Sequence, residues 1–115
     1  MLFYVQMRWK IEPPLTLDQF WELERQEIDV ALQTIKEGKV RGLYKVAAQP
    51  RVIGIIEADS IDDLDRTAMG RLPLRNLLEF EVVWALRDYE SFAVDVREGY
   101  GRLPAAKLPD PPVRQ

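Results

Sequence analysis

One amphipathic stretch, from residue 16 to residue 38, constrains the fold of this chain more than any other. It holds good helix formers and no proline, and Thr16 followed by Gln19 has the pattern of a capping box at a helix start. Gly38 is typical of the residue that ends a helix. The spacing predicts about six turns with an apolar stripe made of Leu17, Trp21, Ile28, Ala31, Leu32 and Ile35, widened by Phe20, Leu23 and Val30.

Two carboxylates interrupt this stripe. Glu24 falls inside it, and Glu27 falls on its flank. A carboxylate that faces a protein interior has its pKa raised by desolvation or must find a partner. These two positions are therefore the first candidates for chemistry. The ordinary alternative is that Glu27 pairs with Arg25 or a neighbouring strand, and that Glu24 is salt-bridged at a subunit contact.

The segments around this helix predict four strands and a second, shorter helix. Residues 2–11 alternate in the manner of a half-buried strand, with Phe3, Val5, Met7, Trp9 and Ile11 on one face and Tyr4, Gln6, Arg8 and Lys10 on the other. Residues 40–48 and 51–58 predict two more strands, and Ser60 with Asp63 marks the start of the second helix. The last strand is predicted to place Leu78, Phe80, Val82, Trp84 and Leu86 on one face.

The order strand, helix, strand, strand, helix, strand predicts an α+β protein. Its simplest packing is the ferredoxin-like βαββαβ arrangement, in which two helices lie on one face of a four-stranded antiparallel sheet. We expect residues 1–87 to form this single domain. Residues 88–115 are expected to be a C-terminal extension: a short element containing Tyr89, Phe92, Val94 and Val96 that docks on the body or on a neighbouring subunit, then a proline-rich arm from Gly99.

The composition excludes several kinds of mechanism. The chain has no cysteine and no histidine, which excludes disulfides, Ser-His-Asp and Cys-His catalysis within one chain, and the common zinc and copper sites. Acid-base chemistry must therefore use Asp, Glu, Lys, Tyr or a substrate group. The net charge of −3 and the lack of a basic run argue against nucleic acid. Arg8 and Lys10 within the apolar N-terminus argue against a signal peptide or membrane span.

Several short segments together resemble a known family. They are MLFYVQM at the start, the long helix with Glu27, its KEG end, the RGLYKVAA strand and the LPL turn before the last strand. Over residues 1 to about 87 the chain is similar to muconolactone delta-isomerases. The resemblance implies a ferredoxin-like subunit that pairs through its sheets as a dimeric α+β barrel and builds larger rings. It also implies a cofactor-free proton shift in an unsaturated lactone during bacterial breakdown of aromatic compounds, with Glu27 at the position of the catalytic carboxylate.

The chain departs from the family pattern at three places. Tyr4 stands where the family usually has a histidine. The second strand offers Val40, Gly42 and Tyr44 in place of an aromatic-histidine-aromatic pattern, and Gln49-Pro50 replaces a His-Tyr pair.

A double-bond shift next to a carbonyl needs a base and a hydrogen-bond donor or cation for the developing dienolate. We expect Glu27 to be the base. The expected substrate-binding residues are Tyr4, Arg41, Tyr44 and Glu24, with Arg8 as a further possible donor. No metal and no cofactor are expected.

Two other functions stay open at this stage. One is a cofactor-free monooxygenase or cyclase that acts on an aromatic or polyketide-like substrate, favoured by the missing histidines and the open position at Gly42. The other is a non-catalytic oligomeric binding protein. In each case the expected protein is cytoplasmic, binds no nucleic acid or membrane, and forms a homodimer or larger homo-oligomer. Its basic edge (Lys39, Arg41, Lys45) is predicted to meet an acidic edge (Glu79, Glu81) of another subunit.

Overall fold

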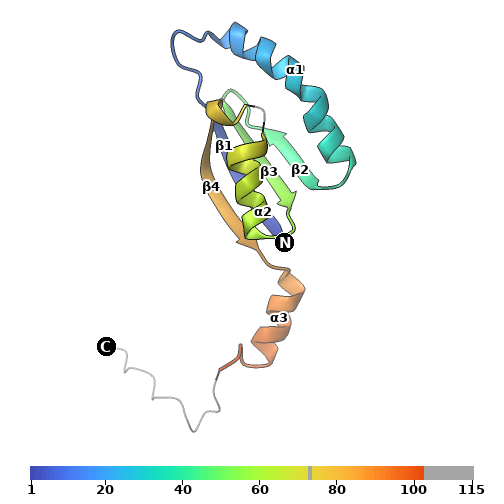
Figure 1. Cartoon of the computed structure of the whole chain (residues 1–115). Helices are drawn as coiled ribbons and strands as arrows, with labels where there is room; N and C mark the ends of the chain where they lie inside the picture. The colour runs from blue at the N-terminus through green and yellow to red at the C-terminus, as the bar shows by residue number, and fades with distance from the viewer. Residues whose placement is uncertain (73, 103–115) are drawn as a thin grey trace, which may run out of the picture.

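The computed structural model describes residues 1–72 and 74–102, and these form the predicted α+β fold. Four antiparallel strands pair in the order β2-β3-β1-β4, so that β2 and β4 are the edges, as expected (Figure 1). The strands are β1 (Leu2–Trp9), β2 (Val40–Lys45), β3 (Arg51–Glu57) and β4 (Leu78–Leu86). The helices are α1 (Leu17–Lys36), α2 (Ile61–Arg66) and α3 (Tyr89–Arg97), with a π turn at Thr67–Arg71 and a 3-10 turn at Arg75–Leu77. No helix in these two described ranges is both long and apolar enough to cross a membrane.

The helix starts are set by the predicted capping residues. The Thr16 hydroxyl accepts the backbone N–H of Gln19, and the Gln19 side chain accepts the backbone N–H of Thr16, so the capping box is complete. Ser60 caps α2 in the same way, by accepting the backbone N–H of Asp63. At the other end of α1, Gly38 has a φ of +83°, which a glycine adopts without strain. Both predicted starts are therefore confirmed.

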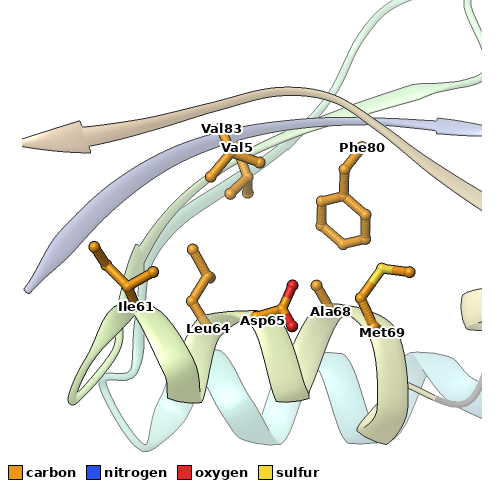
Figure 2. Close-up of a pocket in the computed structure, with 8 residues that line it drawn as sticks. All are labelled: Val5, Ile61, Leu64, Asp65, Ala68, Met69, Phe80 and Val83. Carbon is orange, nitrogen blue, oxygen red and sulfur yellow. The ribbon is translucent and has the colours of Figure 1, made fainter.

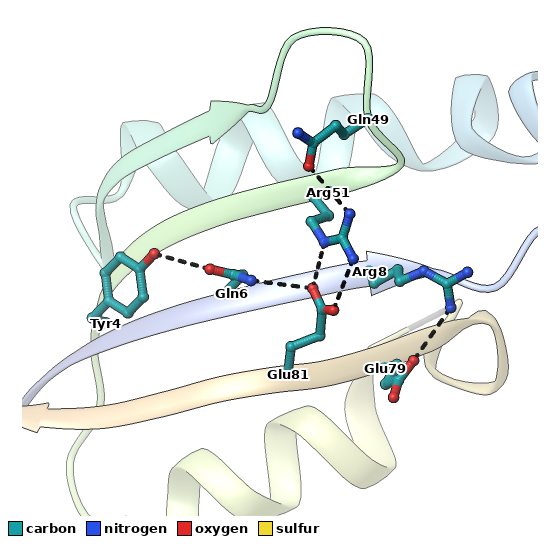
Figure 3. Close-up of polar contacts among 7 residues, drawn as sticks. All are labelled: Tyr4, Gln6, Arg8, Gln49, Arg51, Glu79 and Glu81. Carbon is teal, nitrogen blue, oxygen red and sulfur yellow. Dashed lines mark hydrogen bonds and ion pairs between the residues drawn. The ribbon is translucent and has the colours of Figure 1, made fainter.

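The alternation of β1 divides the sheet into two unlike faces. Phe3, Val5 and Trp9 are buried on the face that carries the helices, and Phe3 and Val5 form the core cluster with Ala58. Tyr4, Gln6 and Arg8 lie on the opposite face, which the helices do not cover (Figure 3). We call this second face the open face of the sheet.

The predicted alternation of β4 is wrong in its second half. The register between β1 and β4 shifts between Gln6 and Met7, where a β-bulge adds a residue to β4. As a result Phe80 and Val83, an odd number of residues apart, point to the same side, beneath α2 (Figure 2). Trp84 then lies on the open face, where its ring stacks on Tyr4. The five residues predicted to share a face are thus divided between the two faces.

The long helix is less buried than its apolar stripe predicts. Only Phe20 is fully buried, and its ring packs against Trp9 and Trp21 at centroid distances of 5.2 and 5.6 Å. Further along α1, Ile28 is 47% exposed and Leu32 is 57% exposed. The physical reason is the position of α1: among the strands it mainly contacts β2, at the edge of the sheet, whereas α2 lies across the sheet (Figure 1).

The C-terminal helix α3 points away from the sheet (Figure 1). Its apolar side carries a small aromatic cluster in which Phe92 contacts both Tyr89 and Tyr100. Arg87 holds α3 to the end of β4 through an ion pair with Asp95 and a hydrogen bond to the Tyr100 hydroxyl. The predicted short element exists as this helix, while most of the predicted arm (residues 103–115) lies outside the described residues. The division at residue 87 stays a prediction.

Phe20→Ala should lower the free energy of unfolding by about 3–5 kcal/mol, because it removes the one fully buried side chain of α1 and leaves a cavity between two tryptophans. Urea titration followed by tryptophan fluorescence measures this loss. Gln26→Ala, an exposed position on the same helix, is the matched control and should cost less than about 0.5 kcal/mol. Equal losses in the two variants would contradict the packing of α1 described above.

Candidate functional site

The two candidate carboxylates lie one turn apart on α1. Glu24 and Glu27 are both half-buried, and within residues 1–72 and 74–102 neither accepts a hydrogen bond or forms an ion pair. Arg25, the predicted partner of Glu27, instead lies 3.5 Å from Glu22. Burial raises the pKa of Glu24, and the negative charge of Glu27 raises it further. The arrangement gives α1 two uncompensated carboxylates beside an apolar stripe, which is the environment expected of a proton-transfer group.

Two of the predicted substrate-binding residues lie on the other side of the sheet from this stripe. Tyr4 stacks on Trp84 on the open face with a ring distance of 5.3 Å, and its hydroxyl donates to Gln6 over 3.3 Å. Tyr44 is 67% exposed and shares the open face with Ile53, its partner on β3. By contrast, α1 approaches the face that carries Trp9. A single chain therefore does not bring these two tyrosines together with Glu27 in one pocket.

Arg41 lies at an irregularity of the edge strand β2. The register between β2 and β3 shifts between Val40 and Gly42, so Arg41 is the extra residue. Its guanidinium is exposed and lies 3.9 Å from the Glu57 carboxylate, the outer limit of an ion pair. Such an exposed pair contributes little and leaves the guanidinium able to meet another anion.

The open face carries a connected polar network (Figure 3). Arg51 donates two hydrogen bonds to the Glu81 carboxylate, over 2.8 and 3.1 Å, and Gln6 donates a third over 3.2 Å. These donors lower the pKa of Glu81, with the Arg51 contact as the larger cause. Arg8 pairs with Glu79 over 3.4 Å. Both acids of the predicted acidic edge thus have cationic partners within their own sheet, and pairing of the two edges across subunits stays a prediction.

A cavity of about 280 Å³ lies between α2 and the sheet, on the side opposite to the open face (Figure 2). Its walls are almost wholly apolar, with Val5, Phe80 and Val83 from the strands and Leu64 and Ala68 from the helical side. Figure 2 shows the Asp65 carboxylate pointing from the helix toward the sheet. Residues of α1 do not line it.

A second cavity of about 270 Å³ adjoins the first and shares Ala68, Met69 and Phe80 with it. Its lining adds Lys10, Arg75 and Asn76, which makes it much more polar. The sequence placed Ile61, Leu64 and Ala68 on one helix face but did not identify this pair of cavities, because Lys10 and Arg75 are brought together only by the tertiary fold. Within the described ranges, no three acidic, histidine or cysteine side chains are grouped so as to hold a metal ion.

Together, the element order and the sheet order define a ferredoxin-like α+β protein. The family described as muconolactone delta-isomerase matches residues 1–91. The chain belongs to this family, and the expected resemblance is confirmed. A structure described as the crystal structure of muconolactone isomerase at 3.3 Å resolution aligns with a TM-score of 0.63 and 24% sequence identity, over 96% of this chain and 98% of that one. At that identity the likeness shows the fold alone. Comparison with curated proteins gave no match.

Glu24→Gln should stabilise the protein at neutral pH and have little effect in acid. The folded-state pKa of Glu24 is raised above its ordinary value of 4.5. The wild type is therefore unaffected by this group below that value and loses stability as the pH rises through the raised pKa. Urea midpoints measured across the acidic and neutral range test this expectation.

Glu81→Gln should have the opposite effect on stability to Glu24→Gln. The Glu81 pKa is lowered by Arg51, so this carboxylate contributes stability above its ordinary value of 4.5, and the contribution disappears as the pH falls through the lowered pKa. Glu81→Gln should therefore destabilise the protein at neutral pH and lose its effect in acid. A stabilising effect of Glu81→Gln, or a destabilising effect of Glu24→Gln, at neutral pH would contradict these assignments.

Proposed function

We propose that this protein is an isomerase that moves a double bond within an unsaturated lactone, or a related product of aromatic ring cleavage, by transferring a proton without a cofactor. Glu27 is the base in this proposal. The observation that carries it is the family match over residues 1–91, a range that includes α1. Within the described parts of the chain, Glu27 on that helix is half-buried and has no ion-pair partner. The proposed setting is the breakdown of aromatic compounds in the cytoplasm.

The chemistry needs only one mobile proton. The ionised Glu27 carboxylate removes a proton from a carbon next to the conjugated carbonyl system, and the C–H electron pair passes into a dienolate. The carboxylic acid formed then returns the proton to the other end of the dienolate, so the double bond has moved and the atoms balance.

The dienolate oxygen needs a donor or a cation. Tyr4 and Arg8 on β1 are engaged in contacts of the open face, with Gln6 and Glu79 respectively. Arg41 and Tyr44 lie on β2, the strand that α1 mainly contacts. We therefore assign the donor role to Arg41 within one chain, and we assign Tyr44, which lies on the open face, as a donor only from a second copy of the chain. Glu24 is assigned to substrate binding, one turn before the base on α1.

We also propose that the working protein is a homodimer or larger homo-oligomer that binds a small molecule. The exposed part of the α1 stripe supports this, since Ile28, Leu32 and Val30 are each about half exposed in a single chain, at 47%, 57% and 55%. Several exposed large apolar side chains on one helix are typical of an interface or a binding groove.

The structure weakens the argument for a monooxygenase or cyclase. That alternative rested on the missing histidines and on open space at Gly42, and the second support is reduced because a Cβ atom placed there would lie 3.1 Å from the Tyr44 ring. The Tyr44 side chain thus occupies the space left by the missing side chain.

Glu27→Gln should lower kcat/KM on muconolactone by about 100-fold to 10,000-fold, since glutamine keeps the shape of the side chain and cannot accept the proton. Ultraviolet absorbance follows the change in conjugation, and circular dichroism verifies folding. Glu22→Gln is the matched control: it changes an exposed glutamate on the same helix and should leave turnover within about twofold. Full activity of Glu27→Gln would overturn the assignment of the base. No turnover by the wild type on muconolactone or its methyl- and chloro-substituted relatives would overturn the proposed reaction and favour a binding protein.

A further inference from the structure

The two cavities beneath α2 form one elongated recess with chemically different ends. One end is lined by Val5, Leu64, Phe80 and Val83 and is almost wholly apolar (Figure 2). The other, basic end is bordered by Lys10 and Arg75. The two ends share Ala68, Met69 and Phe80, so a ligand longer than either end would contact these shared residues. Each end alone is slightly smaller than a typical small-molecule site, and the two together fall within the usual range.

The two ends of the recess carry side chains of opposite charge. Asp65 lies on the wall of the apolar end, and its negative charge opposes an anionic group there. Lys10 and Arg75 border the basic end, and within residues 1–72 and 74–102 neither forms an ion pair with a carboxylate. The Arg75 guanidinium donates only a long hydrogen bond, 3.4 Å, to the Leu72 carbonyl. A ligand with one anionic group is therefore favoured with that group at the basic end and its apolar body in the apolar end.

We propose that this recess is a binding site for an organic carboxylate with an aromatic or alkyl body, in which Lys10 and Arg75 bind the carboxylate and the wall of Leu64, Phe80 and Val83 surrounds the body. The site is separate from the carboxylates of α1, because no residue of α1 lines it. It does not depend on the proposed isomerase activity. A protein with no turnover can still have this site, and an active isomerase can lack it.

The test uses 4-phenylbutanoate and its uncharged analogue, 4-phenylbutanamide, with the full-length protein. Isothermal titration calorimetry gives both affinities, and amide shifts in two-dimensional NMR of the wild type locate the binding without relying on a variant. We expect the carboxylate to bind at least about tenfold more tightly than the amide, as one charge-assisted contact provides. The shifted amides should lie in residues 61–71 and 78–83 and next to Lys10 and Arg75.

Four variants make the test more specific. Lys10→Gln combined with Arg75→Gln should remove the preference for the carboxylate over the amide, whereas Lys36→Gln combined with Arg97→Gln, the matched loss of two distant cations, should keep it. Ala68→Phe should abolish binding of both probes, because Ala68 lines both cavities and the larger side chain would fill space in each. Asp65→Asn should strengthen carboxylate binding about twofold or more, since it removes the opposing charge.

Equal affinity for the two probes would overturn the proposal. So would shifts confined to α1 or to the open face, or no binding at millimolar concentration. The last result would also arise if a second copy of the chain fills the recess, and in that case too no small-ligand site exists.

Discussion

The alternation of side chains along β1 is the constraint on which the rest of the structure depends. β1 is bonded on one side to β3 and on the other to β4, so its side-chain pattern decides what each face of the sheet can carry. Phe3 and Val5 are buried beneath the helices and form part of the core. On the open face, Gln6 donates a hydrogen bond to Glu81, and Arg8 forms an ion pair with Glu79. A one-residue slip would exchange these two faces, which would bury the charged network and expose the core.

The two faces of the sheet also separate the candidate functional residues into two groups. The carboxylates of α1 and the recess beneath α2 belong to the helical side, and Tyr4, Tyr44 and the polar network belong to the open face. The bulge in β4 strengthens the separation, because it directs Val83 toward the helical side and Trp84 toward Tyr4. In a single chain the proposed base therefore has few fixed donors around it. The exposed apolar surface of α1 is consistent with a site that is completed when copies of the chain assemble.

The features predicted correctly from the sequence are those set by local chemistry. Thr16 with Gln19 and Ser60 with Asp63 bind their own helix starts, and the faces of β1 follow from a period of two residues. The bulge in β4 was missed because Val82 and Val83 are both apolar, so the residues give no sign of where the alternation changes. The apolar stripe of α1 predicted which side avoids water, yet amphipathicity does not say whether the same chain or another one covers that side.

The candidate site likewise combines features that the sequence predicts locally with features that depend on tertiary contacts. The unusual position of Glu24 was visible as a break in the stripe, and its raised pKa agrees with the desolvation expected there. The pairing of Arg8 with Glu79, and of Lys10 with Arg75 around one recess, depends on contacts between residues far apart in sequence, which a single sequence does not specify. Glu27 was singled out by family resemblance as well as by its place on the helix, and its role stays a proposal.

The most direct test of the central claim is to locate a substrate-like lactone on the protein. Muconolactone with its ring double bond saturated cannot isomerise. Its binding site can therefore be mapped by amide shifts in two-dimensional NMR without turnover during the measurement. If α1 carries the active site, the largest shifts will fall around Glu24, Glu27 and Ile28, and Glu27→Gln will change them. Shifts confined to the recess beneath α2, with α1 unaffected, would contradict the claim and move the substrate site to that recess.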